Sequence, residues 1–244
     1  MVRYMDICKG LGLNINKKEV LSFVGGGGKT TAIFKLAGEL KSLGKKVLIT
    51  TTTAIYEPTQ GEYDYYFLGD YGEDFCPKVG SITILGREVK GEKLLGISLT
   101  HVERIVHRGF FDFILIEADG AKKKPIKAMA SHEPVISNYS TRTFGIIGMD
   151  CLGKSIEYIV HRPELFVGIV KKGIQDKVDE RDVVKIVLHP IGLFKAAKGR
   201  KVLILNKIDH EEKYIAALNI KSMLLDEGFS GDIVLADIKK GWFY

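Results

Sequence analysis

The chain has 244 residues, of which 45% are hydrophobic and 27% are charged, and its formal net charge is +6 at pH 7. This length suits one large domain or two small ones, and the composition is that of a soluble globular protein. No apolar run approaches the roughly 18 residues that a membrane-spanning helix needs, so we expect no membrane span.

The N-terminal residues and the few isolated cysteines favour a cytoplasmic location. The first residues lack the apolar core and cleavage site of a signal peptide. The three cysteines, Cys8, Cys76 and Cys151, are isolated, and no C-x-x-C motif supports a zinc site. The positive charge fits nucleic acid, an acidic partner, or a solvated surface with a phosphate pocket. Because the lysines are spread along the chain, we favour the last and do not expect nucleic acid as a partner.

The first strong signal in chain order is a glycine turn between a strand and a helix. A short lead-in, with one helical turn around residues 5–11, precedes an apolar run over residues 20–24 that predicts a buried strand. Four glycines and Lys-Thr-Thr follow, and then an amphipathic segment over residues 32–43 with Gly44 as its C-cap. This layout is that of a phosphate-binding loop, in which backbone N–H groups and the helix dipole hold an anion.

The loop assigns separate roles to its residues. Lys29, which we expect to be exposed to the ligand rather than to the core, would reach the β- and γ-phosphates, and the Thr30 hydroxyl would bind Mg²⁺. The first glycine of the usual G-x-x-x-x-G-K-[ST] motif is replaced by Phe23. The alternative is therefore a glycine-rich turn in an ordinary βα unit. The predicted phosphate-binding residues are Gly25, Gly26, Gly27, Gly28, Lys29, Thr30 and Thr31.

Four consecutive threonines end the next predicted strand. The strand covers residues 46–49 and runs into residues 50–53. High β-propensity alone would explain such a run. However, the end of the strand after the first crossover is where a parallel α/β sheet places ligand contacts. One hydroxyl would then complete the Mg²⁺ shell, and we name Thr53 because it is nearest the glycine loop.

Residues 56–98 predict a β-rich excursion from the main sheet. Strands are expected at residues 63–68 and 81–85, and residues 84–97 have hairpin character with a turn at residues 90–92. A helix over residues 100–107 is expected to end near Gly109.

The next strand, predicted over residues 112–116, leads into a pair of carboxylates. In P-loop nucleotidases a carboxylate at the end of the strand beside the loop strand holds Mg²⁺, and we assign this role to Glu117. Asp119 shares its face in extended chain and would act nearer the γ-phosphate, against which Gly120 would bring its N–H. A solvated acidic turn is the alternative. The candidate catalytic residues are Lys29, Glu117 and Asp119.

The following region predicts a basic loop and a helical insertion. The loop covers residues 121–126, where it would bind phosphate or an acidic partner, or simply be solvated. A strand is predicted over residues 143–148, and helices near residues 163–172, 180–188 and 191–197 form an insertion over about residues 151–199. Histidines near the prolines here are more commonly caps or core residues than ligands. They are His132, His161 and His189.

The last predicted strand–helix unit carries a base-recognition signature. An apolar strand over residues 201–205 runs into N-K-x-D, in which Asp209 would accept two N–H bonds from guanine. Asn206 would tie this loop to the phosphate loop, and the stem of Lys207 would lie over the base. A helix over residues 211–226 and a strand over residues 233–236 follow, and the backbone N–H of Ala236 would reach the base carbonyl. We therefore predict GTP as the ligand, with ATP as the alternative.

Together these elements predict one α/β domain over residues 1–244. Its architecture would be the three-layer P-loop NTPase fold with a mainly parallel sheet, the β-rich excursion and the helical insertion.

Several segments in order also resemble a known family. The stretch KTTAIFKLAGELKSLGKKVLITTTT is similar to the start of SIMIBI-class P-loop NTPases. More closely, the chain resembles the selenium-dependent hydroxylase accessory protein family (YqeC-type). This resemblance implies a cytoplasmic nucleotide-binding protein that helps mature a selenium-dependent molybdenum hydroxylase, with that enzyme or its cofactor machinery as partner. The matching segments are SFVGGGGKTT, ITTTT, EADGAKKKPIKA, HEPVI, HRPELF, HPIGLFK and LNKID.

The resemblance has limits, and it leaves three functions open. Val24 stands where partition-type ATPases carry a second lysine, and no Cys/His cluster supports a nickel or zinc cargo. The first function is an Mg²⁺-dependent NTP hydrolase acting as an assembly factor, in which no residue stands out as an arginine finger. The second is a small-molecule kinase with an acceptor pocket among the three histidines named above. The third is a non-hydrolysing, nucleotide-gated binding module whose basic loop docks an acidic partner.

Overall fold

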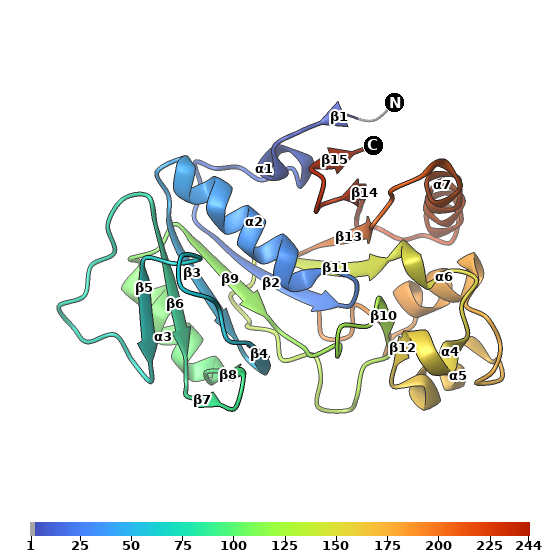
Figure 1. The fold of residues 1–244 in the computed structure, drawn as a ribbon, viewed down its shortest axis with the longest axis horizontal. Coiled ribbons are helices and arrows are strands. Elements are labelled where there is room, and N and C mark those ends of the chain that lie inside the picture. Colours follow the sequence, from blue (N-terminus) through green and yellow to red (C-terminus); the bar gives the residue numbers. More distant parts are fainter. Residues whose placement is uncertain (1–2) are drawn as a thin grey trace.

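A ten-stranded, mainly parallel sheet forms the centre of the computed structural model, which describes residues 3–244 (Figure 1). Residues 1 and 2 of the predicted lead-in lie outside the described residues. The strand order is β1-β15-β14-β13-β11-β2-β9-β3-β6-β5, and only the pairings of β15 with β1 and β14 are antiparallel among the pairs of this sheet in the described chain. The strands are β1 (Arg3–Tyr4), β2 (Glu19–Gly25), β3 (Lys46–Thr51), β5 (Tyr65–Leu68), β6 (Ser81–Gly86), β9 (Phe113–Glu117), β11 (Arg142–Gly148), β13 (Arg200–Asn206), β14 (Asp232–Asp237) and β15 (Trp242–Phe243).

Helices cover both faces of this sheet, which confirms the predicted three-layer α/β architecture. Leu21 and Phe23 of β2 pack with α1 and α2 on one face. Val20 packs with α3 and Val24 with α5–α7 on the other face. These alternating contacts are those of a strand buried on both sides. The helices are α1 (Ile7–Gly10), α2 (Lys29–Ser42), α3 (Leu99–Arg108), η1 (Met149–Cys151), α4 (Ile156–Ile159), α5 (Pro163–Val170), α6 (Glu180–Leu188) and α7 (Glu211–Asp226).

The strand order brings the predicted motifs to one edge of the sheet. β2 lies between β9 and β11, and all three are parallel. The register pairs Phe23 of β2 with Glu117 at the end of β9, and Thr51 of β3 also pairs with Glu117. The residues that follow β2, β9 and β3 therefore lie together beyond the carboxyl ends of these strands, which is where parallel sheets bind ligands.

The β-rich segment divides between two sheets. β5 and β6 extend the main sheet beyond β3. Only β4 (Ala54–Tyr56), β7 (Val89–Lys90) and β8 (Lys93–Leu95) form the separate three-stranded sheet, with the predicted hairpin turn between β7 and β8. The excursion is therefore smaller than the sequence predicts, because Ile82, Ile84 and Leu85 are buried strand residues of the main core.

The helical segment contains α5 and α6 as predicted, but the predicted helix over residues 191–197 is wrong. This stretch forms separate turns, with hydrogen bonds such as Lys195 N–H to Gly192 O (3.1 Å). Gly192 packs so closely on α6 that a Cβ there would lie 2.0 Å from the Ile186 carbonyl oxygen. Ala196 adopts a φ of +57°, which interrupts any helix.

A second small sheet lies beside the carboxyl ends of β2 and β11 (Figure 1). Its strands, β10 (Ile126–Lys127) and β12 (Val160–His161), pair in parallel and place Lys127 opposite His161. This pairing brings the chain that follows the acidic turn against the start of α5.

Candidate functional site

The glycine turn between β2 and α2 has a backbone that only glycine adopts readily. Gly25, Gly27 and Gly28 have φ values of +96°, +76° and +126°. A Cβ at Gly27 would lie 2.2 Å from the backbone nitrogen of Gly148. Both backbone conformation and close approach therefore require glycine here.

The first three N–H groups of this turn are used by the protein itself. Gly25 donates to Asp119 Oδ2 (3.0 Å), Gly26 to the Ile146 carbonyl (2.9 Å) and Gly27 to the Lys124 carbonyl (3.0 Å). The N–H groups of the first turn of α2 have no partner within the helix. Of the N–H groups predicted to bind phosphate, those of Gly25, Gly26 and Gly27 are therefore already bonded within the protein, and Gly25 does not line the cleft described below.

Lys29 is buried between two carboxylates. Its side chain is 4% exposed, and its Nζ lies 3.1 Å from Asp119 Oδ1 and 3.6 Å from Glu117 Oε1. Nζ also donates to the Gly25 carbonyl at 2.6 Å. Lys29 lines the cleft described below, and its amine contacts the protein's own carboxylates there. Its exposure to a ligand stays a prediction. Burial alone would lower the pKa of Lys29, but Asp119 and Glu117 raise it above its ordinary value and keep the amine charged.

The predicted magnesium ligands are adjacent. Thr30 Oγ1 donates to Glu117 Oε2 at 2.9 Å. Burial raises the pKa of Glu117, and Lys29 and Thr30 only partly oppose this. The hydroxyls of Thr50, Thr51 and Thr52 donate to backbone carbonyls of the protein, whereas Thr53 lines the same cleft as Thr30 and Glu117. Hydroxyl and carboxylate oxygens are hard donors that fit Mg²⁺.

Asp119 has one oxygen engaged and one without a hydrogen bond. Its side chain is fully buried, and Oδ2 accepts from the Gly25 N–H and lies 3.0 Å from Lys127 Nζ. Oδ1 accepts no hydrogen bond from any residue in the described part of the chain and has only the ion-pair contact with Lys29. The Lys29 ammonium is therefore the polar group that compensates the burial of this oxygen.

A buried charge network, absent from the sequence prediction, continues outward from Asp119. Lys127 is 1% exposed, and its Nζ donates to Glu133 Oε2 (2.7 Å) and to the Gly120 carbonyl (2.6 Å). Arg162 pairs with the same Glu133 oxygen. Burial would raise the pKa of Glu133, but the bonds from Arg162 and Lys127 lower it to about 2. The three cations and three carboxylates from Lys29 to Arg162 thus balance one another in charge.

Asn206 ties the predicted base loop to the glycine turn, as expected, and the Asp209 carboxylate of that loop pairs with Lys213. Asn206 Nδ2 donates to the Gly27 carbonyl (2.8 Å) and its Oδ1 accepts from the Ile238 N–H (3.0 Å). Lys207 Nζ lies 2.8 Å from Asp150 Oδ2. Asp209, whose side chain is 40% exposed, pairs with Lys213 at 2.7 Å, which lowers the pKa of Asp209.

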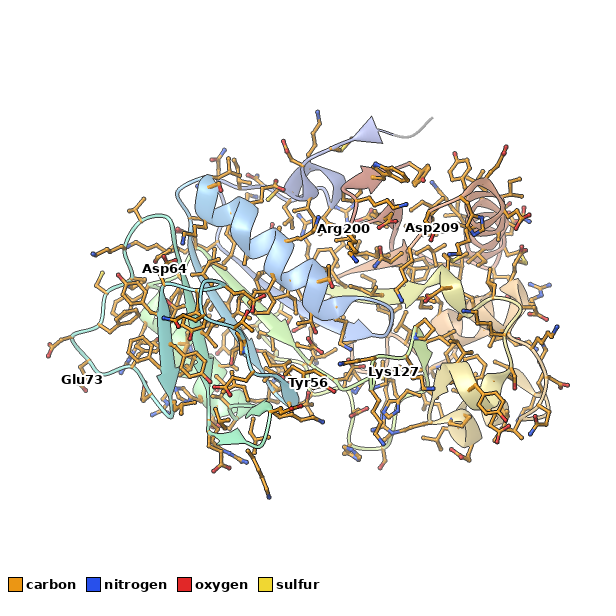
Figure 2. The ribbon with its side chains drawn as sticks, viewed as in Figure 1. Tyr56, Asp64, Glu73, Lys127, Arg200 and Asp209 are labelled. Atoms are coloured by element: carbon orange, nitrogen blue, oxygen red, sulfur yellow. The ribbon has the colours of Figure 1, made fainter. Side chains whose placement is uncertain are left out.

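Figure 2 shows Asp209 beside the start of α7, apart from Tyr56 and Lys127. Ala236 is buried, and its carbonyl accepts from the Ile208 N–H (3.1 Å). Guanine recognition by Asp209 and Ala236 stays a prediction.

The phosphate loop opens into a cleft of about 1090 Å³. Its inner part is formed by the loop and by Glu117 and Gly120. Of the three histidines, only His161 lines this cleft; His132 is exposed, and His189 is the C-cap of α6. From the predicted loop, the lining residues are Gly26, Gly27, Gly28, Lys29, Thr30 and Thr31.

Two comparisons identify the family. The sequence model of the YqeC protein family matches residues 21–164, which is more than half of the chain. The uncharacterized protein YqeC of Escherichia coli (strain K12) is 34% identical over 203 residues, covering 81% of this chain and 79% of its own length. The chain belongs to the YqeC family. The YqeC match includes the glycine turn, the acidic turn and the network out to Arg162, and it ends before the base loop.

No helix in residues 3–244 is long and apolar enough to cross a membrane.

Proposed function

We propose that this YqeC-family chain is a Mg²⁺-dependent nucleoside triphosphatase that binds GTP, with ATP as the alternative nucleotide. One observation carries the proposal: a charged, buried lysine sits at the first position of a helix, after a glycine turn, between two carboxylates. A cation, helix N–H donors and metal-binding oxygens at one place are what a triphosphate requires.

On nucleotide binding, Lys29 would exchange its contacts with protein oxygens for contacts with phosphate oxygens. Lys29 would leave the Gly25 carbonyl and the carboxylates for the β- and γ-phosphates, and the N–H groups of the first turn of α2 would hold the phosphate oxygens. Thr30, Glu117 and Thr53 would hold Mg²⁺, which neutralises charge on the phosphates. Asp119 would keep its charge balance through Lys127 and would accept a hydrogen bond from the attacking water at Oδ1.

Hydrolysis is the reaction that these groups favour. A small-molecule kinase is the second candidate, because the structure places His161 and Arg162 in the same cleft as the phosphate loop. The proposed biological role is maturation of a selenium-dependent molybdenum hydroxylase. Support for that role is the family resemblance alone, and the expected partner is the hydroxylase or its cofactor machinery.

A phosphate-release assay tests the reaction. Purified protein is incubated with Mg²⁺ and either GTP or ATP, and Thr30→Ala is compared with Ser42→Ala, a hydroxyl deletion at the far end of the same helix that bonds only to the Gly38 carbonyl. We expect slow release by the wild type and by Ser42→Ala, and none by Thr30→Ala. Binding without release would make the chain a binding module, and release only with an added acceptor would make it a kinase.

A further inference from the structure

The cleft is larger and more basic than a triphosphate site alone requires. Seven cationic side chains line it, against two carboxylates, Glu117 and Glu133. Its volume of about 1090 Å³ is slightly above the roughly 300–1,000 Å³ typical of small-molecule pockets. The cations are Lys29, Lys93, Lys122, Lys123, Lys124, Arg162 and Lys207.

Most of this charge lies outside the phosphate loop, in what we call the outer half of the cleft. It is lined by Tyr56, Lys93, residues 122–124, His161 and Arg162. Tyr56 of β4 and Lys93 of β8 belong to one wall, and His161 of β12 and Arg162 before α5 belong to the other. Tyr56 and Lys127, labelled in Figure 2, lie on these two sides. The basic loop is fixed against the phosphate loop, since the Gly27 N–H donates to the Lys124 carbonyl.

Unfavourable backbone conformations concentrate on the cations of this cleft. Among the described residues, six non-glycine residues have positive φ, and four of them line the cleft. These four are Lys122 (+46°), Lys123 (+61°), Arg162 (+64°) and Lys207 (+64°). Lysine and arginine gain nothing locally from the left-handed region, and such strain clusters at functional sites where the surrounding fold imposes it. The fold therefore fixes the backbone at these four cations at a local cost.

Two side chains in the outer half suit an oxyanion beyond the γ-phosphate. Arg162 lies at the far end of the network from Lys29, separated from it by Asp119, Lys127 and Glu133. A guanidinium held by one carboxylate still has donors for a second anion. His161 beside it is neutral, because burial and the neighbouring Arg162 and Lys127 lower its pKa to about 4. A neutral imidazole both donates and accepts hydrogen bonds.

We propose that the outer half of the cleft binds a second small molecule that bears a phosphate group, held by Arg162 and Lys122 and facing the γ-phosphate position. The proposal rests on the proposed function only in assigning the inner half to the triphosphate. Phosphate is favoured over a single carboxylate because its two negative charges neutralise more of the excess of cations.

Titration of inorganic phosphate, followed by ³¹P NMR, tests this site. The titration is done on free protein, on protein saturated with Mg²⁺ and a non-hydrolysable GTP analogue, and on Lys29→Ala. We expect the phosphate of the outer half to bind in all three, and acetate to compete poorly with it. Any phosphate held by the phosphate loop should be lost when the analogue is bound and in Lys29→Ala. Arg162→Gln should weaken binding roughly tenfold or more, as for loss of a charge-assisted hydrogen bond. Arg200→Gln is the control, since Arg200 also pairs with one carboxylate, Asp232, but lies outside the cleft.

A second variant covers the case in which Arg162→Gln fails to fold. Lys122 is exposed, and Lys122→Asn removes its charge while keeping a residue that tolerates positive φ. It should weaken phosphate several-fold and leave the GTP analogue unaffected. If all bound phosphate is lost when the analogue is bound, or in Lys29→Ala, the phosphate belongs to the phosphate loop, and the second site is refuted while the proposed function stands. If the analogue does not bind but phosphate depends on Arg162 and Lys122, the proposed function fails and the second site stands.

Discussion

Lys127→Met isolates the buried network, because it deletes one charge and keeps the length of the side chain. Lys127 Nζ contacts Asp119, Glu133 and the Gly120 carbonyl within 3.0 Å. Removing it leaves three carboxylates against two cations. The fall of the Glu133 pKa from 4.5 to about 2 corresponds to about 3 kcal/mol, at about 1.36 kcal/mol for each pKa unit. Arg162 causes part of this pKa shift, so Lys127 alone contributes less than the whole amount through Glu133. The substitution also removes a cation beside Asp119, and we therefore expect a destabilisation of about 3 kcal/mol in total.

Urea unfolding at pH 7 and pH 3.5 measures this cost. A carboxylate whose pKa is depressed in the folded state contributes stability above its ordinary pKa, and loses it as pH falls through the folded value. The difference between wild type and Lys127→Met should therefore shrink as pH falls from about 4.5 towards 2. Lys41→Met is the control, because Lys41 and Asp64 form a half-exposed pair whose loss should cost less than about 1 kcal/mol. A cost for Lys127→Met below about 1 kcal/mol at pH 7, or one independent of pH, would refute the reasoning.

Three further predictions concern the metal, pH and the base. Glu117→Gln should abolish the Mg²⁺ dependence of nucleotide binding, whereas Asp119→Asn should slow phosphate release with a smaller effect on that dependence. Nucleotide titrations with and without EDTA measure the dependence. If neither variant differs from the wild type, this segment is only an acidic turn. His161, neutral when folded, should destabilise the protein as pH falls from 6.5 towards about 4, since the unfolded state takes up the proton first; melting curves of His161→Gln should lose this part of the pH dependence. Asp209→Asn should weaken GTP and improve xanthosine triphosphate in competition assays, and an unchanged ranking with ATP equal to GTP would mean that Asp209 does not read the base.

The local signals in the sequence were sufficient for most elements. The strand, glycine turn and helix around Lys29 follow from hydrophobic period and glycine content, and β9 with its acidic turn follows in the same way. The helix over residues 211–226 has the predicted bounds. The prediction for residues 191–197 is wrong because their apolar spacing suggests a helix, whereas Gly192 packs closely against α6 and the positive φ of Ala196 is not helical.

The network around Lys127 could not be predicted, because it depends on contacts between distant segments. Lys127 lies in a two-residue strand whose partner is found 34 residues later, in Val160–His161. Such short strands have no readable period. Three consecutive lysines precede Pro125, and no local feature of the sequence distinguishes these lysines from Lys127, which is buried. A resemblance covering both HEPVI and HRPELF, together with the acidic turn, was the one available signal that these segments act together.

Calorimetric titration of Mg·GTP and Mg·ATP tests the phosphate-loop assignment most directly. The comparison is between wild type, Lys29→Ala and Lys41→Ala, which removes an exposed lysine from the same helix. Loss of charge-assisted bonds to two phosphates should weaken binding by roughly a hundredfold or more in Lys29→Ala. We predict one triphosphate bound per chain, at equal affinity in wild type and Lys41→Ala. Equal affinity in Lys29→Ala, or no triphosphate binding by the folded wild type, would contradict the account.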